Sequence, residues 1–146
     1  MRVAIDATPL IGPRTGIGVF VEGLLLSLQD GSSEEVDLQI AEYTLSLKAR
    51  LRGEARGYWI PMPASASSFV WRTFSGPKIE SFVGDIDVVH GTNFVLPPSS
   101  SPRVISVHDL SFLNHLGRSR NSTGRFDRSV REAVNSGATV HTISEY

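Results

Sequence analysis

The chain has 146 residues, 20% of them charged, and a formal net charge of −1 at pH 7. This length suits one domain with its own core, because domains cluster at about 100–150 residues, and the charge balance does not favour nucleic acid as a partner. Cysteine is absent, which excludes disulfides and thiolate metal sites and fits a reducing, cytoplasmic compartment. No signal peptide is expected, because Asp6 interrupts the N-terminal apolar run, and no apolar run approaches the ~20 residues of a membrane span.

Short apolar runs alternate with helical patterns along the chain. Strands are expected over 3–5, 36–41, 58–60, 87–90, 103–107 and 139–144, from period-2 alternation or from apolar runs of strand length. Helices are expected over 16–28, 44–52, 65–83 with a break at Gly76-Pro77, and 121–136. This order predicts a single α/β domain over 1–146, a Rossmann-like parallel sheet with helices on both faces.

A glycine-containing turn connects the first expected strand to the first helix. Thr15 is a suitable N-cap, and Gly16 and Gly18 would let a ligand approach the backbone. The free N–H groups of the first helical turn and the helix dipole favour an anion such as phosphate there. A dinucleotide fingerprint would place a third glycine where the chain has Val21. The alternative is a tight strand-to-helix entry that binds no ligand.

The strand over 87–90 ends at a histidine and is followed by Gly91-Thr92-Asn93. Gly91 allows a sharp exit from the strand, and the amide of Asn93 offers donors and an acceptor, which suits a hydroxyl-rich ligand. The alternative is a turn in which Thr92 and Asn93 bond their own backbone.

The next strand ends at His108-Asp109. Such a pair orients an imidazole, binds a hydroxyl or acts as a base; the alternative is that Asp109 caps the following turn and His108 is a packed strand-end residue. Because the carboxyl ends of parallel strands meet at one sheet edge, where ligands bind, we expect His90 and His108 to share a crevice.

The histidines show no tight His-x-His or His-x₃-His spacing, so no metal site is expected. A metal-dependent hydrolase that uses them is kept as an alternative of another class, and His141 is interpreted as a structural strand residue. Basic residues gather over 48–56 and 118–131. They are interpreted as solvated helix faces, with peripheral membrane contact as the alternative.

Four segments carry a resemblance to a known family: Thr15-Gly16-Ile17-Gly18 at the start of the first helix, then 87–97, 104–112 and 140–145. In this order they resemble the N-terminal half of the GT4 family of retaining glycosyltransferases, in particular its mannosyltransferase-like members. Those enzymes have the GT-B fold, two Rossmann-like domains that face each other across a cleft. The resemblance implies that 1–146 is the acceptor-side domain, without the C-terminal nucleotide-sugar domain. No crossover helix follows the last expected strand, so a longer natural chain is expected.

The resemblance implies transfer of a mannose-type hexose from a nucleotide sugar, such as GDP-mannose or a UDP-sugar, to a hydroxylated or glycan acceptor, with no cofactor or metal. The implied site residues are Thr15, Gly16 and Gly18 for the donor diphosphate, His90, Thr92 and Asn93 for the acceptor, and His108 and Asp109 for catalysis. One local departure is Val19-Phe20, which stands where relatives often carry Arg-Tyr.

A stand-alone Rossmann-like domain that binds a nucleotide or dinucleotide is the alternative function. Glu42, near the end of the second strand, is then the candidate for holding a ribose, although the missing third glycine counts against this interpretation. For the glycosyltransferase we expect 1–146 alone to show no turnover, because a closed cleft is what brings donor and acceptor together. A cytoplasmic location is expected, with peripheral membrane contact as an addition.

Overall fold

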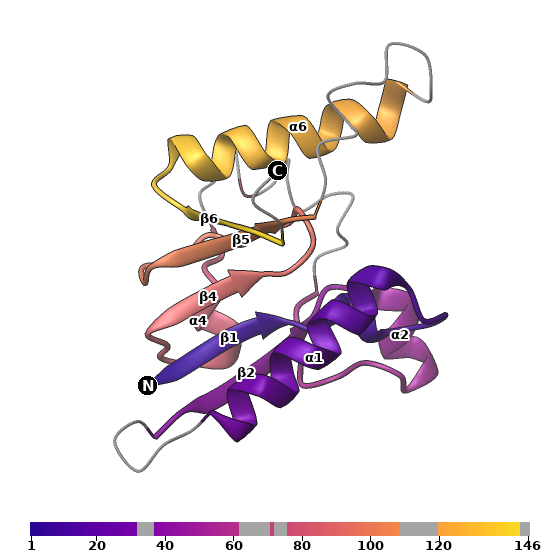
Figure 1. Ribbon diagram of the computed structural model, residues 1–146, viewed down its shortest axis with the longest axis vertical. Helices are drawn as coiled ribbons and strands as arrows, with labels where there is room; N and C mark the ends of the chain where they lie inside the picture. The colour runs from indigo at the N-terminus through magenta and orange to yellow at the C-terminus, as the bar shows by residue number, and fades with distance from the viewer. Residues whose placement is uncertain (32–36, 62–70, 72–75, 109–119, 144–146) are drawn as a thin grey trace.

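The computed structural model describes residues 1–31, 37–61, 71, 76–108 and 120–143, with the backbone alone for 120–126. Its strands are β1 (Arg2–Asp6), β2 (Gln39–Thr44), β3 (Tyr58–Trp59), β4 (Val88–Gly91), β5 (Arg103–Val107) and β6 (Thr139–Thr142). They form one sheet in the order β3-β2-β1-β4-β5-β6, and every pairing is parallel (Figure 1). The predicted α/β class and parallel Rossmann-like sheet are confirmed.

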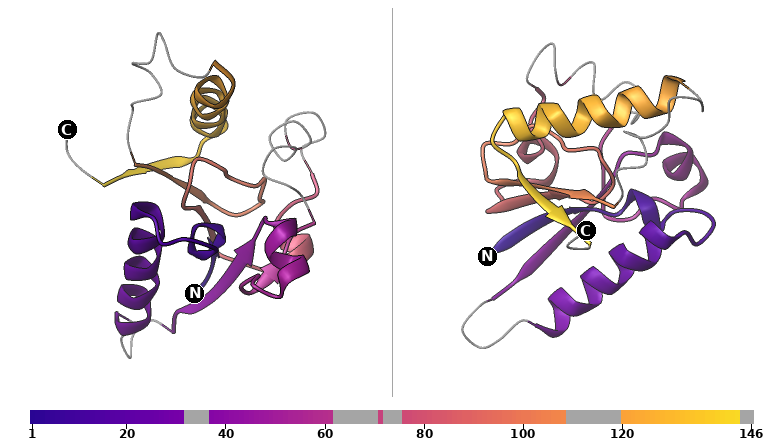
Figure 2. Two further views of the ribbon diagram at one scale, coloured as in Figure 1. Left: turned by 90° about the vertical axis from the view of Figure 1, so that its right-hand side faces the viewer. Right: turned by 45° about the horizontal axis from the view of Figure 1, so that its top comes forward.

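Helices lie on both faces of this sheet. The described helices are η1 (Thr8–Leu10), α1 (Gly16–Asp30), α2 (Leu47–Arg52), α4 (Glu80–Val83) and α6 (Arg120–Asn135). Seen along the sheet in the left view of Figure 2, α1 stands on one side of the strands and α4 on the other. α1 and α4 therefore cover separate cores on opposite faces of the sheet, as is typical of parallel sheets.

The core under α1 is built by alternate residues of β1. Val3 and Ile5 point to this face and pack with Val21 and Leu25, which are one helical turn apart on α1. Partly buried Val88 of β4 joins them from the neighbouring strand. Burying each such side chain stabilises the fold by roughly 1.5–3 kcal/mol, so this stripe fixes which face of α1 meets the sheet.

The core on the opposite face uses the other set of alternating residues. Ala4 of β1, Tyr43 of β2 and Val89 of β4 pack there against Ile79 and Val83 in and next to α4. Ala4 and Tyr43 are fully buried, and so is Ile60 just after β3. Because the side chains of a strand alternate between faces, the residues flanking Val89 belong to the α1 side.

The second strand is the element that the sequence misplaces. The prediction over 36–41 was wrong by about three residues, since β2 spans Gln39–Thr44 and pairs with β1 from Gln39 opposite Arg2 to Tyr43 opposite Asp6. Alternating apolar residues before position 41 resemble a half-buried strand, but burial of Ala41, Tyr43 and Thr44 decides the register.

The helix expected over 44–52 begins later, at Leu47, because the Ser46 hydroxyl accepts a hydrogen bond from the Ala49 N–H and caps it there. Of the helix expected over 65–83, the structure describes residue 71 and residues 76–83, where α4 begins at Glu80. The last helix agrees with the prediction to within one residue, and Gly137 follows its end with a left-handed φ of +81°.

Candidate active site at the carboxyl edge of the sheet

His90 and His108 lie on neighbouring strands at the edge where the strands end. His90 is the third residue of β4 and pairs with Ile5 of β1 and Val104 of β5, and His108 directly follows β5. Both lie on the face that α1 covers, as the contact between the Phe20 ring of α1 and the His108 ring shows, with centroids 5.0 Å apart. The expected approach of the two strand ends is therefore present.

The imidazole of His108 is held in one orientation. Its Nε2 lies 2.7 Å from the carbonyl oxygen of Thr92. A carbonyl oxygen only accepts hydrogen bonds, so Nε2 carries the proton in this contact and Nδ1 of the neutral ring is left as an acceptor. Phe20 and Phe94 both meet the ring edge to face, the Phe94 centroid at 6.1 Å. His108 thus presents a hydrogen-bond acceptor whose direction is fixed from two sides.

The loop after β4 is tightly folded around this contact. Phe94 has a φ of +55°, which is uncommon for a residue with a side chain, and such strain persists where the surroundings impose it. A Cβ on Gly91 would lie 2.2 Å from the carbonyl oxygen of Val95, so no other residue fits there without a backbone shift. The predicted sharp exit at Gly91 is confirmed by this close approach.

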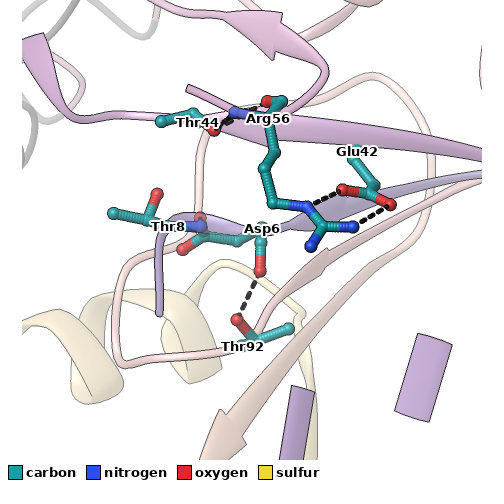
Figure 3. A network of polar contacts seen from close by, with 6 residues as sticks. All are labelled: Asp6, Thr8, Glu42, Thr44, Arg56 and Thr92. Carbon is teal, nitrogen blue, oxygen red and sulfur yellow. Dashed lines mark hydrogen bonds and ion pairs between the residues drawn. The ribbon is translucent and has the colours of Figure 1, made fainter. Parts of the chain in front are cut away.

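A hydrogen-bond network ties the same loop to the end of β1 (Figure 3). The buried Thr92 hydroxyl donates to the Asp6 carbonyl oxygen at 2.7 Å, and the Thr8 N–H donates to the Asp6 carboxylate at 2.9 Å. The Leu45 N–H in turn donates to the Thr8 hydroxyl at 3.0 Å, which brings in the end of β2. Burial raises the pKa of Asp6 to about 6 against the opposing hydrogen bonds from Thr8. The Thr92 hydroxyl therefore holds the loop in place and is not exposed for contact with a ligand.

His90 lies deeper than His108 and is linked to Ser106. Its Nε2 is 2.8 Å from the hydroxyl oxygen of Ser106, a fully buried residue of β5. The same hydroxyl oxygen lies 3.1 Å from Nδ1 of His141 on β6. Burial, with the nearby His141 and His108, lowers the pKa of His90 to about 4, so this imidazole is neutral at pH 7. The sequence analysis missed Ser106; the one readable signal was that it lies two residues before His108, so alternation places both on one face of the sheet.

The turn before α1 caps the helix as predicted. The Thr15 hydroxyl accepts a hydrogen bond from the Gly18 N–H at 3.1 Å. Gly18 is buried, and a Cβ there would lie 2.8 Å from the Pro9 carbonyl oxygen, so its need for glycine is explained by packing. Gly16 is exposed with open space around it, and its amide and that of Ile17 belong to the first turn, where helix N–H groups have no helical partner.

Two predicted site residues remain, Asn93 after β4 and Asp109 after His108. Asn93 is half-buried, and within the described residues its side chain makes no hydrogen bond, so its amide is available to a ligand. Asp109, proposed beside His108, lies outside the described residues.

Other features lie away from this edge. A cavity of about 350 Å³ borders α6 and the segment after β4, and none of the predicted site residues lines it. Glu42 of β2 accepts two hydrogen bonds from the Arg56 guanidinium, at 2.8 and 3.3 Å (Figure 3). Within the described parts of the chain, no group of three His, Asp or Glu side chains is arranged to hold a metal ion. In those same parts, no helix combines the length and the apolar character needed to cross a membrane.

Comparison with known proteins adds no relative to this geometry. No protein-family model, no curated protein and no solved structure matches the chain.

Proposed function

We propose that residues 1–146 form the acceptor-side domain of a retaining, GT4-like glycosyltransferase that moves a hexose from a nucleotide sugar to a hydroxylated acceptor. The observation that carries the proposal is the fixed imidazole of His108, whose Nε2 bonds the Thr92 carbonyl while Nδ1 remains an acceptor at the sheet edge. An acceptor nitrogen of this kind receives a hydrogen bond from a sugar hydroxyl. With Asn93 and the neutral His90 nearby along the chain and sheet, the edge offers hydrogen-bonding groups suited to an uncharged polyhydroxylated ligand.

The donor side of the proposal is smaller in this chain. The first turn of α1 leaves the amides of Gly16 and Ile17 for a phosphate oxygen, since the Thr15 cap occupies the Gly18 N–H. Most of the donor contacts are assigned to a second domain.

Peripheral membrane contact stays a secondary proposal, based on the basic residues over 48–56 and 118–131. Two of these residues already form ion pairs within the domain, Arg56 with Glu42 and Arg131 with Asp127.

The alternative of a dinucleotide-binding domain is weakened by one contact. In that alternative Glu42 would bind the ribose of the dinucleotide. Both carboxylate oxygens of Glu42 already accept hydrogen bonds from Arg56. A ribose would have to displace a charge-assisted pair, which is stronger than a neutral hydrogen bond.

The test is binding to residues 1–146, measured by saturation-transfer NMR and calorimetry against methyl hexosides, GDP-mannose, UDP-glucose and NAD. We expect weak hexoside binding that falls about tenfold in His108→Phe, because one hydrogen bond to a polar ligand is lost while the aromatic packing stays. The control is Gln39→Ala, an exposed position on the opposite half of the sheet, which should bind as the wild type does. We also expect no sugar transfer by this chain alone.

Three results would contradict the proposal. They are preferential binding of NAD, the absence of hexoside binding in the wild type, and hexoside binding that is equal in His108→Phe. Efficient sugar transfer by residues 1–146 without a second domain would refute the division of donor and acceptor between two domains.

A further inference from the structure

A single serine hydroxyl on the middle one of three neighbouring strands connects two imidazoles, one on each of the strands beside it. Ser106 Oγ on β5 lies 2.8 Å from His90 Nε2 on β4 and 3.1 Å from His141 Nδ1 on β6. Ser106 is fully buried, so water does not supply these contacts. The register fixes the arrangement, because Ser106 is paired directly with His141 and lies two residues after Val104, the partner of His90. The three side chains therefore share one face of the sheet.

Because the Ser106 hydroxyl has a single proton, it links the tautomer of His90 to the tautomer of His141. A serine hydroxyl has one proton, so it donates to one imidazole and accepts from the other. In one arrangement His90 Nε2–H donates to Ser106, which donates to His141 Nδ1, and Nδ1 of the neutral His90 ring is then an acceptor. In the reverse arrangement His141 Nδ1–H donates to Ser106, which donates to His90 Nε2, and His90 Nδ1–H is a donor. The tautomer of His90 therefore follows that of His141.

The surroundings keep the rings in this contact. The Phe20 ring of α1 stacks on His141 at 5.7 Å, and the His141 and His90 rings meet edge to face at 5.9 Å. The titratable groups that act on His90 are His141 on β6 and His108 after β5, while α1 contributes the uncharged Phe20. His108 takes no part in the exchange, since its Nε2–H is committed to the Thr92 carbonyl.

Protonation selects one of the two arrangements. A His141 ring with both nitrogens protonated has no acceptor to offer, so its Nδ1–H must donate to Ser106. The Ser106 proton then goes to His90 Nε2, and the His90 proton moves to Nδ1, with no net charge placed on His90. Burial lowers the pKa of His90 to about 4, so this ring resists taking up a second proton itself.

We propose that Ser106 and His141 are positioning residues that set whether His90 meets a bound hydroxylated ligand as a hydrogen-bond acceptor or as a donor. Protonation of His141 turns His90 into a donor at Nδ1. This inference rests on the proposed function for its ligand, but the hydrogen-bond relay itself does not depend on any ligand.

The test is ¹⁵N NMR of the histidine rings in residues 1–146, because long-range ¹H–¹⁵N spectra distinguish the two neutral tautomers from the imidazolium form. The chain has four histidines, so His90→Gln and His141→Gln variants assign the two signals that matter. As the pH is lowered until His141 carries both ring protons, we expect His90 to become fully Nδ1-protonated while it stays neutral. A His90 ring that keeps its proton on Nε2 once His141 carries both ring protons would overturn the proposal.

Two variants of Ser106 separate the relay from packing. In Ser106→Ala the His90 tautomer should no longer follow His141, and in Ser106→Thr, which keeps the hydroxyl, the coupling should return. Coupling that persists in Ser106→Ala would also overturn the proposal, and the wild-type titration decides alone if either variant fails to fold. Loss of hexoside binding with the coupling intact would instead refute the proposed function and leave the relay standing.

Discussion

Asp6 is a carboxyl group with almost no contact with water, placed beneath the edge where the site lies. Burial raises its pKa from 3.8 to about 6, so the folded protein keeps a proton that the unfolded chain loses at lower pH. Between these two values the folded state binds more protons than the unfolded state. Its contribution to the free energy of unfolding therefore falls as the pH rises through that window, by up to about 3 kcal/mol.

Asp6→Asn removes this titration while its side-chain oxygen still accepts from the Thr8 N–H. We expect Asp6→Asn to be more stable than the wild type by about 1–3 kcal/mol at pH 7.5, with a smaller difference near pH 4, measured by urea unfolding. Asp30→Asn, at the exposed end of α1, is the matched control and should follow the wild-type pH dependence. A stability difference that is the same at both pH values would refute this account of Asp6.

Thr92 offers a second test at the scale of one side chain. Thr92→Val keeps the shape of the buried residue but removes the hydroxyl that donates to the Asp6 carbonyl oxygen. We expect a loss of about 1–2 kcal/mol in the free energy of unfolding, while the His108 contact with the Thr92 carbonyl remains. Thr139→Val on exposed β6 should change stability by less than about 0.5 kcal/mol. Equal effects of the two substitutions would show that the buried hydroxyl contributes no specific stability.

Helix α1 shows how glycine can have opposite effects within one element. A Cβ on Gly18 would lie 2.8 Å from the Pro9 carbonyl oxygen, whereas a Cβ on Gly23 would meet nothing within 4 Å. We expect Gly18→Ala to destabilise the protein by about 1–3 kcal/mol through this clash. We expect Gly23→Ala to stabilise it by about 0.5–1 kcal/mol, because alanine restricts the unfolded chain and favours helix. Thermal unfolding of both variants decides, and a stabilising Gly18→Ala would show that η1 moves freely away from α1.

The elements that could be predicted are those whose apolar pattern reflects their final burial. For β5 the expected and observed bounds coincide, and α6 has one amphipathic stripe with a glycine after its end. The bounds of β2, about three residues later than expected, could not be predicted. Its register is decided by pairing with β1 and by the burial of Tyr43 in the core on the α4 face of the sheet. Local alternation contains neither fact.

The site divides in the same way. His90 and His108 could be placed at one edge from the strand pattern alone, since parallel strands end together. The contacts of Ser106 with His141, and of His108 with the Thr92 carbonyl, join residues that are 35 and 16 positions apart. They depend on strand order and loop conformation, which the spacing of residues does not encode. The interpretation of His141 as a structural residue did not include this hydrogen bond.

At the scale of the whole molecule, the strand order sets a gradient of local stability. β1 is paired on both sides, with β2 and β4, and its residues from Val3 to Asp6 are buried, whereas β6 ends the sheet and is mostly exposed. Exposed edges open more readily than central strands. We expect the amides of β1 to exchange with deuterium most slowly and those of β6 fastest, measured by native-state hydrogen exchange. Protection that is uniform from β1 to β6 would mean that the sheet opens as one unit.

The central position of β1 also matters while the chain is being synthesised. The nascent chain can pair β1 with β2 once β2 has emerged, but the other side of β1 has to wait for β4. Arg2 and Asp87, which are hydrogen-bonded in the folded protein, are 85 positions apart. Until then an apolar strand has one open edge, which is the kind of surface that pairs with other chains. A ribosome that pauses between α2 and β4 would leave this edge of β1 open for longer, which exposes it to pairing with other chains.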